Sequence, residues 1–531
     1  MPPRGHPTGP PGLRLHPRLA ALLPGGVQPA LPGAAGLLRP DSRRRVSGVE
    51  ARLETEVCVI GGGPAGAALA LRLARLGHSV CVVERHAFPR PHVGESLTPG
   101  VWPLLDTLGV VDEVRRGGFL PALESLVCWE ELTGRRVRGR AGEPGLLVDR
   151  GRFDALLLGA AASAGVRVLQ PAVAQRPERT ADGWELPVLH EGRRLVVSAR
   201  FLADASGRTA CLGGRKQIVS ARTLALYGYW RGDTPHGPET RVEAGPDGWY
   251  WGAHLPDGTF NAMAFVDPEL LRERGIGRRT LESFYRELLG RSSLLEAWTS
   301  PRLVGSVLAC DATCYRDTVP IERDCIKVGE ASFSIDPLSS SGVQKALQTA
   351  LSGAVAVHTL LARPEHAEAA LRFYTEDQRS SAEQHAAWAA GYYRDARSYQ
   401  ERPFWKRRAL APAAVAPSEV RPPLSEDGLS HRRWRLAGDA ALVDTPCIVG
   451  DGIELRRAVS HPRLGRPVAY LEGVELAPLV EWLGQVPGEG LTMPQLADTW
   501  ARRMPFRRSV AIMGWLYRQG LLTEVTADGP R

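Results

Sequence analysis

The chain has very little lysine. Only four lysines occur among its 66 basic side chains, at Lys216, Lys327, Lys345 and Lys406. The formal net charge is +8, but the first 50 residues hold seven arginines and two acids, so that 7 − 2 = 5 charges lie there and 8 − 5 = 3 remain for the rest. No concentrated basic patch follows, which argues against a nucleic-acid-binding surface.

Long apolar segments and paired cysteines are missing too. No apolar run reaches the roughly 18 residues of a membrane span, so we expect no membrane insertion. The eight cysteines are scattered, and no second ligand pair accompanies Cys310 and Cys314. This spacing excludes the usual zinc and disulfide frameworks and predicts unpaired thiols in a cytoplasmic protein without a metal site.

Composition and periodicity divide the chain into five parts. The first is rich in Pro and Arg and shows no sustained period. In chain order we expect a disordered extension (1–52), a nucleotide-binding domain (53–360) with substrate-domain insertions near 101–147 and 216–309, a helical segment (361–410), a linker (411–430) and a C-terminal domain (431–531).

The first ordered segment is typical of a βαβ unit. The run from Thr55 to Ile60 predicts a buried strand, Pro64 to Leu76 an Ala/Leu-rich helix, and His78 to Glu84 a second strand. The turn between the first strand and the helix, 61–66, fits G-x-G-x-x-G. In this context the pattern predicts a dinucleotide site.

Each part of that turn has a chemical purpose. Gly61 permits the tight turn, Gly63 lets the backbone approach a pyrophosphate, and Gly66 allows close packing of helix on strand. The helix N-terminus offers free N–H groups to the phosphates. Glu84, 18 residues after Gly66, can accept hydrogen bonds from an adenosine ribose.

Three later segments identify the dinucleotide. They are GRFDALLLGAA after Val148-Asp149-Arg150, FLADASGR at 201–208, and VGEASFSIDPLSSSGVQKAL at 328–347. With the glycine turn, in this order and over roughly residues 54–360, they resemble the FAD-dependent monooxygenase and halogenase superfamily. The resemblance implies an α/β, Rossmann-like FAD-binding fold of the aromatic hydroxylase/halogenase type, with an inserted antiparallel sheet.

The resemblance also implies the contacts with FAD. Glu84 would bind the ribose, Arg150 would lie near the phosphates or ribityl chain, and Asp204 would belong to a second fingerprint. Glu330 replaces the usual Asp of a Gly-Asp motif but keeps the carboxylate. The full predicted cofactor set is Gly61, Gly63, Ala65, Gly66, Glu84, Arg85, Arg150, Asp204, Gly329, Glu330, Asp336, Ser341, Gly342 and Val343.

The last of these segments is expected to lie beside the isoalloxazine ring. A helix starting at about Val343 would aim its positive end at the flavin N1/C2 carbonyl and stabilise the anionic reduced flavin.

Two further segments resemble flavin-dependent halogenases. HVGESLTPG at 92–100 is similar to their G-E-S/T segment, and GWYWGAHLP at 248–256 to their W-x-W-x-I-P motif, with the spacing stretched by two residues. Both tryptophans of the second motif would share one face of a strand, either lining a pocket or packing the sheet. The predicted catalytic residues are Glu95, Ser96, Trp249, Trp251 and Pro337.

A third segment departs from the halogenases. GGFLPALES at 117–125 resembles the stretch that carries the catalytic lysine of phenol-type enzymes, and Ala122 stands in its place. We therefore predict loss of halogenation. Hydroxylation of an aromatic substrate through a flavin C4a-hydroperoxide needs no lysine, only a desolvated pocket and a positioned ring.

The C-terminal domain suggests a peptide or protein partner. Helical patterns over 493–502 and 505–519, then a strand-like run over 521–525, predict a winged-helix-like module that binds a peptide by strand addition. With the missing lysine, this is similar to the branch that hydroxylates a protein-borne Trp during tryptophylquinone cofactor maturation.

Three other functions stay open. They are halogenation or hydroxylation of a small aromatic metabolite, a geranylgeranyl-reductase-like activity, and a flavin-bound DNA-binding regulator. The sequence also leaves open whether NAD(P)H reduces the FAD directly or a partner flavin reductase does so.

Overall fold

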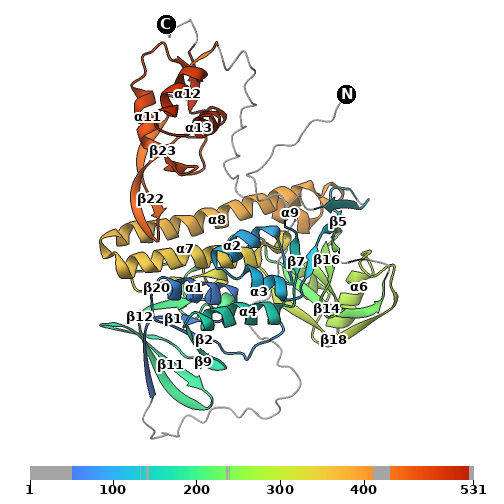
Figure 1. The fold of residues 1–531 in the computed structure, drawn as a ribbon. Helices are drawn as coiled ribbons and strands as arrows, with labels where there is room; N and C mark the ends of the chain where they lie inside the picture. Colours follow the sequence, from blue (N-terminus) through green and yellow to red (C-terminus); the bar gives the residue numbers. More distant parts are fainter. Residues whose placement is uncertain are drawn as a thin grey trace. The chain divides into compact units, whose positions relative to one another are not determined.

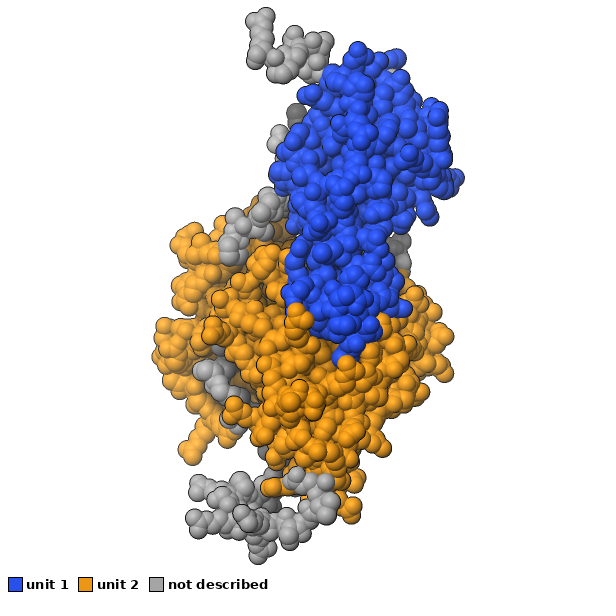
Figure 2. Space-filling view, turned by 90° about the vertical axis from the view of Figure 1, so that its left-hand side faces the viewer, with its two compact units in different colours: residues 1–11, 359–373, 413–531 blue, residues 12–358, 374–412 orange. Residues whose placement is uncertain are grey.

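The computed structural model describes residues 51–131, 133–138, 143–234, 237, 239–410 and 431–525. Most of the predicted extension and the whole predicted linker lie outside these residues. Of the described residues, one compact unit holds 359–373 and 431–525, and the other holds 51–358 and 374–410 (Figure 2). No helix in this part of the chain is long and apolar enough to cross a membrane.

A largely parallel sheet organises the larger unit (Figure 1). β1 (Ala51–Ile60) lies between β12 (Arg193–Asp204) and β2 (Val80–Val83) and is parallel to both. Val57 to Ile60 are all buried, as expected for a strand covered on both faces. The other strands of this sheet are β8 (Arg167–Leu169), β9 (Ala172–Ala174), β10 (Glu178–Thr180), β11 (Gly183–His190) and β20 (Cys325–Lys327).

The predicted start of order is wrong by two residues. Ala51 and Arg52 belong to β1, because they pair with Leu195 and Val196 of β12. A pairing partner more than 140 residues later in the chain extends this strand beyond what its own apolar pattern indicates.

Helices cover this sheet. α1 (Pro64–Arg75) follows the glycine turn and contacts α4 (Arg150–Ser163), whose first turn is capped by the Asp149 carboxylate. Between them the chain forms short elements: β3 (Ser96–Leu97), η1 (Pro99–Val101), α2 (Trp102–Thr107), α3 (Val111–Arg116), β4 (Leu120–Ala122) and β7 (Gly145–Leu147).

Both predicted insertions contribute to one seven-stranded sheet. Its order is β18-β14-β17-β16-β15-β5-β6, and only the β15–β5 pair is parallel. This confirms the inserted antiparallel sheet and shows that the earlier insertion completes it. The strands are β5 (Glu124–Cys128), β6 (Arg135–Arg138), β14 (Leu224–Asp233), β15 (Thr240–Gly245), β16 (Gly248–His254), β17 (Phe260–Val266) and β18 (Thr299–Asp311).

Aromatic side chains fill one face of this sheet. Trp249 is fully buried and stacks on Phe265 with 4.5 Å between ring centroids, and Trp129 meets it edge-on at 5.6 Å. Trp251 belongs to the same core. The other face packs on α5 (Pro268–Glu273) and α6 (Leu281–Leu289).

The remaining elements belong to the larger unit except over residues 359–373, which are part of the smaller one. They include a small hairpin and two long helices that lie side by side, since the Tyr374 hydroxyl of the second reaches the Thr349 carbonyl of the first (Figure 1). The elements are η2 (Gly207–Thr209), β13 (Lys216–Ile218), β19 (Tyr315–Asp317), η3 (Gly329–Ala331), η4 (Pro337–Ser339), α7 (Gly342–Ala362), η5 (Pro364–His366), α8 (Ala367–Asp395), η6 (Arg397–Tyr399) and α9 (Pro403–Ala409).

The C-terminal unit has its own apolar core of residues such as Trp434, Trp500 and Leu516. A three-stranded sheet, β26-β21-β27, and three helices enclose it, and a long hairpin, β22–β23, follows β21 in the chain. The two helices expected here are present, but the winged-helix assignment stays a prediction. The elements are β21 (Arg433–Leu436), β22 (Ala441–Val449), β23 (Gly452–Ser460), β24 (Tyr470–Leu471), β25 (Val474–Glu475), α11 (Ala477–Gly484), β26 (Leu491–Thr492), α12 (Met493–Ala501), α13 (Phe506–Arg518) and β27 (Leu522–Glu524).

The aromatic core gives a stability prediction. Trp249→Ala should lower the free energy of unfolding by about 3–5 kcal/mol, because it leaves a cavity against Phe265 and Trp129. Val304→Ala, at a side chain on β18 that is 39% exposed, should cost less than about 1 kcal/mol. Urea unfolding of both variants tests this; equal losses would contradict the packing role of Trp249.

Candidate functional site

The glycine turn has the shape that a diphosphate needs. A Cβ on Gly66 would lie 1.9 Å from the Gly61 carbonyl oxygen, so only glycine allows α1 to pack this closely. A Cβ on Gly63 would meet only Arg90 Nη2, at 3.7 Å. Gly63 therefore leaves open space at the N-terminus of α1, where no side chain caps the helix and no acid occupies the first turn. Ala65 is buried behind this opening.

Glu84 lies at the end of β2, where the sequence predicts it. Its two carboxylate oxygens accept hydrogen bonds from the Gly62 N–H at 2.7 Å and the His86 N–H at 2.8 Å. The side chain is buried and closes the glycine turn, and its remaining acceptor sites suit the ribose contact predicted for it. Its neighbour Arg85 is exposed.

A buried ion-pair cluster lies beside this turn. Asp154 is fully buried and accepts two hydrogen bonds from Arg150, at 3.0 and 3.1 Å, while Arg90 pairs with it at 3.2 Å. The remaining Arg150 nitrogen donates to the Val93 and Gly94 carbonyls. Arg150 is thus engaged by protein groups, and a contact with the flavin stays a prediction.

Arg90 is the basic residue that the sequence analysis missed here. Its Nη1 is buried and has no hydrogen-bond partner among the described residues. Because Arg90 Nη2 faces the open side of Gly63, the guanidinium can bind a diphosphate placed against the turn. An unpartnered buried donor beside an uncapped helix N-terminus fits FAD at this position.

His92, in the same segment, is held in one neutral form. His92 is exposed, and the nearby charge of Arg150 lowers the pKa of its imidazole. Nδ1 lies 2.7 Å from the Val93 carbonyl oxygen, so it carries the proton and Nε2 stays an acceptor.

The second fingerprint is present around Asp204. The Asp204 carboxylate is fully buried and accepts hydrogen bonds from Ser206 and from the Leu212 N–H, which fixes the turn after β12. Gly329, at φ +62°, lies where a Cβ would come within 2.7 Å of the Ala65 side chain. This close approach joins the second fingerprint to the first.

Glu330 keeps an accessible carboxylate next to this junction. It lies 3.7 Å from Arg208, whose other partners are Asp311 at 3.2 Å and the Thr313 carbonyl. The side chain of Glu330 is 45% exposed, which suits the predicted contact with the ribityl chain.

The segment predicted beside the flavin ring forms a defined loop. Asp336 caps η4 by accepting from the Leu338 N–H at 3.1 Å, and half-buried Pro337 is the first residue of that turn. Ser340 has a positive φ of 51°, the Ser341 N–H donates to Ser339 Oγ, and α7 begins at Gly342, just before Val343. No acid lies in the first turn of α7, so its positive end stays available.

A small hollow adjoins this loop. Ser340 lines it together with Ser96 and Ala122, the residue in place of the halogenase lysine. The sequence prediction that Ser96 and the ring-side segment lie together agrees with this geometry. The other lining residues are Leu97, Thr98, Pro99, Leu123, Ser125, Gly145 and Thr240.

Glu95 faces the inserted sheet. Its Oε1 accepts from the Tyr229 hydroxyl at 2.8 Å, Oε2 accepts from the Gly94 N–H at 2.8 Å, and Asn261 Nδ2 lies 3.3 Å from both oxygens. Burial raises the pKa of Glu95, and these donors only partly offset it. Tyr229 and Asn261 come from strands far along the chain, and no local sequence signal marks them.

Trp249 and Trp251 point the same way, as predicted, but into the aromatic core described above. That position agrees with the packing alternative, and a catalytic role for either stays a prediction.

Two carboxylates and a thiol, groups that can bind a metal ion, lie close together at Glu322, Asp324 and Cys325. Arg179 pairs with both carboxylates at 2.8 Å.

The glycine turn gives a matched test of cofactor binding. Gly63→Ala should fold normally but weaken FAD binding by roughly tenfold or more, since its methyl group occupies the space of the diphosphate. Gly66→Ala should instead destabilise the fold by at least about 1–3 kcal/mol, through its clash with the Gly61 carbonyl. Fluorescence titration of apoprotein with FAD, beside thermal unfolding, separates the two effects. A Gly63→Ala variant that binds FAD normally would contradict this geometry.

The environment of Glu95 gives a pH prediction. Its folded-state pKa is raised, so its contribution to stability is fully present below the unfolded pKa and is lost as pH rises through the folded pKa. The titratable groups facing it are Arg150, Tyr227, Tyr229 and Cys310.

Glu95→Gln removes this loss of stability with rising pH. The unfolding free energy of the variant, relative to the parent, should therefore rise as pH increases from acidic to mildly alkaline values. Denaturant unfolding across that range measures it, and a difference independent of pH would show that the Glu95 pKa is not raised.

Comparisons with known proteins bear on the family and the cofactor. The sequence model of a family described as an FAD binding domain matches residues 54–218. The chain is 32% identical over 382 residues to a tryptophan 2-halogenase of Chondromyces crocatus, covering 67% of this chain and 71% of that protein.

Solved structures show the same similarity. The peptidyl tryptophan dihydroxylase QhpG, described as essential for tryptophylquinone cofactor biogenesis, superposes with a TM-score of 0.70 at 26% identity, covering 88% of this chain and 100% of QhpG. The flavin-dependent halogenase CmlS gives a TM-score of 0.73 at 24% identity, covering 90% of this chain and 98% of its own, and supports the fold alone.

Proposed function

Because this chain belongs to the superfamily of FAD-dependent halogenases and monooxygenases, we propose that it hydroxylates an aromatic group, and that this group is a tryptophan side chain of a peptide or protein. FAD is its cofactor, and the coarser activity is that of a flavin-dependent oxidoreductase. The similarity to QhpG over nearly the whole chain supports the tryptophan substrate.

The placement of the four lysines is the observation that carries hydroxylation over halogenation. Each Nζ is already engaged: Lys216 by the Arg208 carbonyl at 2.8 Å, Lys327 by Asp317 at 2.9 Å, Lys345 by the Phe333 carbonyl at 2.5 Å and Lys406 by Glu401 at 2.6 Å. Burial lowers the pKa of Lys345 to about 8, but its ammonium points at Phe333. The hollow beside the ring-side loop has Ala122 instead.

The chain's own groups then have defined tasks. When bound and reduced, FAD activates dioxygen. The glycine turn and Arg90 hold its diphosphate, and the N-terminus of α7 stabilises negative charge on the ring. The hollow has a volume of about 20 Å³, too small for an aromatic ring, so its hydroxyls would contact the substrate at its mouth. Glu95, buried beside Tyr229, accepts the proton that the aromatic ring releases on substitution.

We extend the proposal to the partner. A peptide or protein carrying the tryptophan would bind to the C-terminal unit, where β22 pairs with β23 alone among the described residues. The Asp444 carbonyl of β22 accepts a hydrogen bond from Arg372 at 2.8 Å. The stretch of β22 beyond it offers an unpaired edge for strand addition, beside the exposed side chains of Ile448 and Leu455.

Halogenation is the second candidate. The 32% identity to a tryptophan 2-halogenase favours it. The tryptophan in that protein's name carries an indole, so the ring that is modified would again be an indole. Both candidates thus share the substrate class and differ in the atom that is transferred.

The mass of the product distinguishes hydroxylation from halogenation. The FAD-loaded protein, a flavin reductase with NADH, oxygen, bromide and a tryptophan-containing peptide should give a product heavier by oxygen and free of bromine. Ala122→Lys should make brominated product detectable, because it returns an ammonium to the hollow. Val173→Lys, at a residue of β9 that is 49% exposed and does not line the hollow, is the control and should give none.

Brominated product from the parent protein would replace hydroxylation with halogenation. Failure of both reactions, with FAD bound and reoxidised by oxygen, would remove the tryptophan peptide as the substrate.

A further inference from the structure

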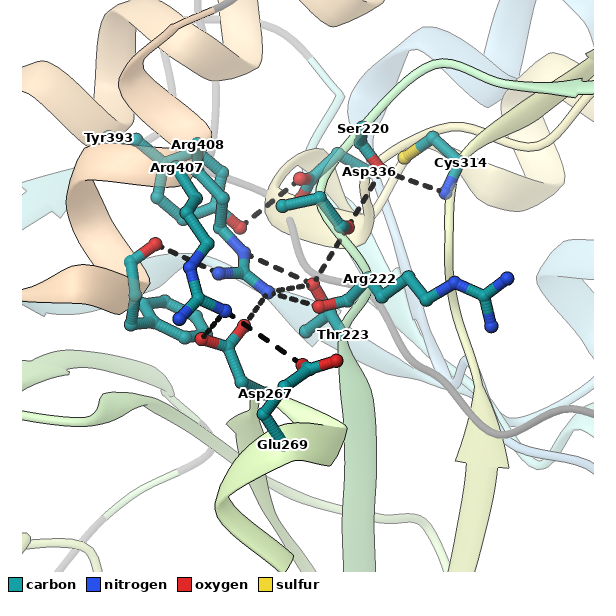
Figure 3. A network of polar contacts seen from close by, with 12 residues as sticks. Ser220, Arg222, Thr223, Asp267, Glu269, Cys314, Asp336, Tyr393, Arg407 and Arg408 are labelled. Carbon is teal, nitrogen blue, oxygen red and sulfur yellow. Dashed lines mark hydrogen bonds and ion pairs between the residues drawn. The ribbon is translucent and has the colours of Figure 1, made fainter. Parts of the chain in front are cut away.

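A buried polar network fastens the end of α8 and α9 to the rest of the larger unit (Figure 3). Arg408 of α9 lies at its centre, with a side chain that is 2% exposed. Its Nη2 donates to Asp267 at 2.8 Å and to the Arg222 carbonyl at 2.7 Å, Nη1 donates to the Phe404 carbonyl, and Nε donates to Thr223. This fixes α9 against the two residues before β14 and the residue after β17.

Tyr393 of α8 lies beside this anchor. Its ring is enclosed by Trp405 at 5.8 Å, Phe404 at 6.2 Å and Trp129 at 6.3 Å between centroids, and it is 2% exposed. Because the aromatic neighbours fix the ring, they also fix the direction of the hydroxyl. Burial raises the pKa of Tyr393 well above its ordinary value, so the group keeps its proton and donates.

The acceptor is Asp336, at the start of the ring-side loop. The Tyr393 hydroxyl donates to Asp336 Oδ2 at 3.1 Å, while Oδ1 of the same carboxylate caps the Leu338 N–H at 3.1 Å. Figure 3 shows the contact between Tyr393 and Asp336. One carboxylate thus joins α8 to the turn that leads into α7.

The conformation of that turn depends on this carboxylate. After the capped residues comes Ser340, with a positive φ of 51° that non-glycine residues rarely adopt. The N-terminal N–H groups of α7 follow directly. A strained residue persists only where its surroundings over-determine it, and the bond from Tyr393 supplies part of that constraint.

We propose that Tyr393 is a positioning residue for the flavin: by pinning Asp336 it fixes the ring-side loop and the N-terminus of α7 that faces the isoalloxazine. The inference needs FAD to lie beside this loop but does not need hydroxylation to be the reaction. In addition to packing, α8 and α9 would then influence the visible absorption and the reduction potential of the flavin.

The chain offers a matched control on the same helix. Tyr374 is fully buried, and its hydroxyl donates to the Lys327 carbonyl at 2.8 Å. Tyr374→Phe and Tyr393→Phe remove the same atom from two equally enclosed tyrosines. They differ in the partner that loses its donor: a strand carbonyl in one case and the carboxylate of the ring-side loop in the other.

The experiment compares both variants as FAD-loaded proteins by hydrogen exchange, visible absorption and flavin reduction potential. Loss of a hydrogen bond to a charged group should speed amide exchange over residues 336–342 by about tenfold in Tyr393→Phe. The visible band and the potential of bound FAD should shift with it. Tyr374→Phe should leave all three signals at parent values, with faster exchange near Lys327 instead.

Equal changes in both variants, or unchanged flavin signals in Tyr393→Phe, would overturn the proposal. Asp336→Asn tests the same hydrogen bond at its acceptor. The variant retains a carbonyl oxygen for the Leu338 N–H but loses the charge, and it should also shift the visible band and the potential of bound FAD. Because the readouts are spectroscopic, a protein that holds FAD but fails to hydroxylate peptides leaves this test intact.

Discussion

Asp154 lies buried one turn into α4 and is shared by Arg90 and Arg150. Each arginine does a second task that depends on this pair. Arg150 holds the Val93 and Gly94 carbonyls, which places Glu95. Arg90 places Nη2, the nitrogen paired with Asp154, beside Gly63, and its Nη1 has no partner among the described residues. Taking away one partner would leave a buried charge without compensation, at a cost of about 3–5 kcal/mol. The glycine turn and the position of Glu95 thus both depend on one carboxylate.

Much of the candidate cofactor site could be predicted from the sequence, because the steric constraints on it act between residues close together in the chain. A strand, a glycine turn and a helix impose steric demands that the residues themselves satisfy, as with Gly61 and Gly66. The inserted sheet was predictable for a similar reason, since aromatic and β-branched residues alternate between turn residues. Its assembly from two insertions was not, because pairing of β5 with β15 leaves no trace in either strand alone.

The sequence alone does not reveal hydrogen bonds between residues that only folding brings together. Tyr229 and Glu95 are 134 residues apart, and the Asp336–Tyr393 bond spans 57. Arg150 shows the limit of a resemblance: the motif places it near the flavin phosphates, but its guanidinium is taken up by Asp154 and two carbonyls. Arg90 lies outside every motif, and only the geometry around Gly63 marks it.

The parallel pairing of β5 with β15 also constrains how the chain is made. Ser125 and Thr240, whose hydroxyls meet across this pair, are 115 residues apart. A ribosome therefore releases β5 and β6 as a two-stranded ribbon long before their neighbour exists, and such a ribbon is marginally stable by itself. The unpaired edge of β5 stays open to wrong partners throughout that interval. Cellular folding of this enzyme depends on keeping that edge covered until residues 240–245 emerge.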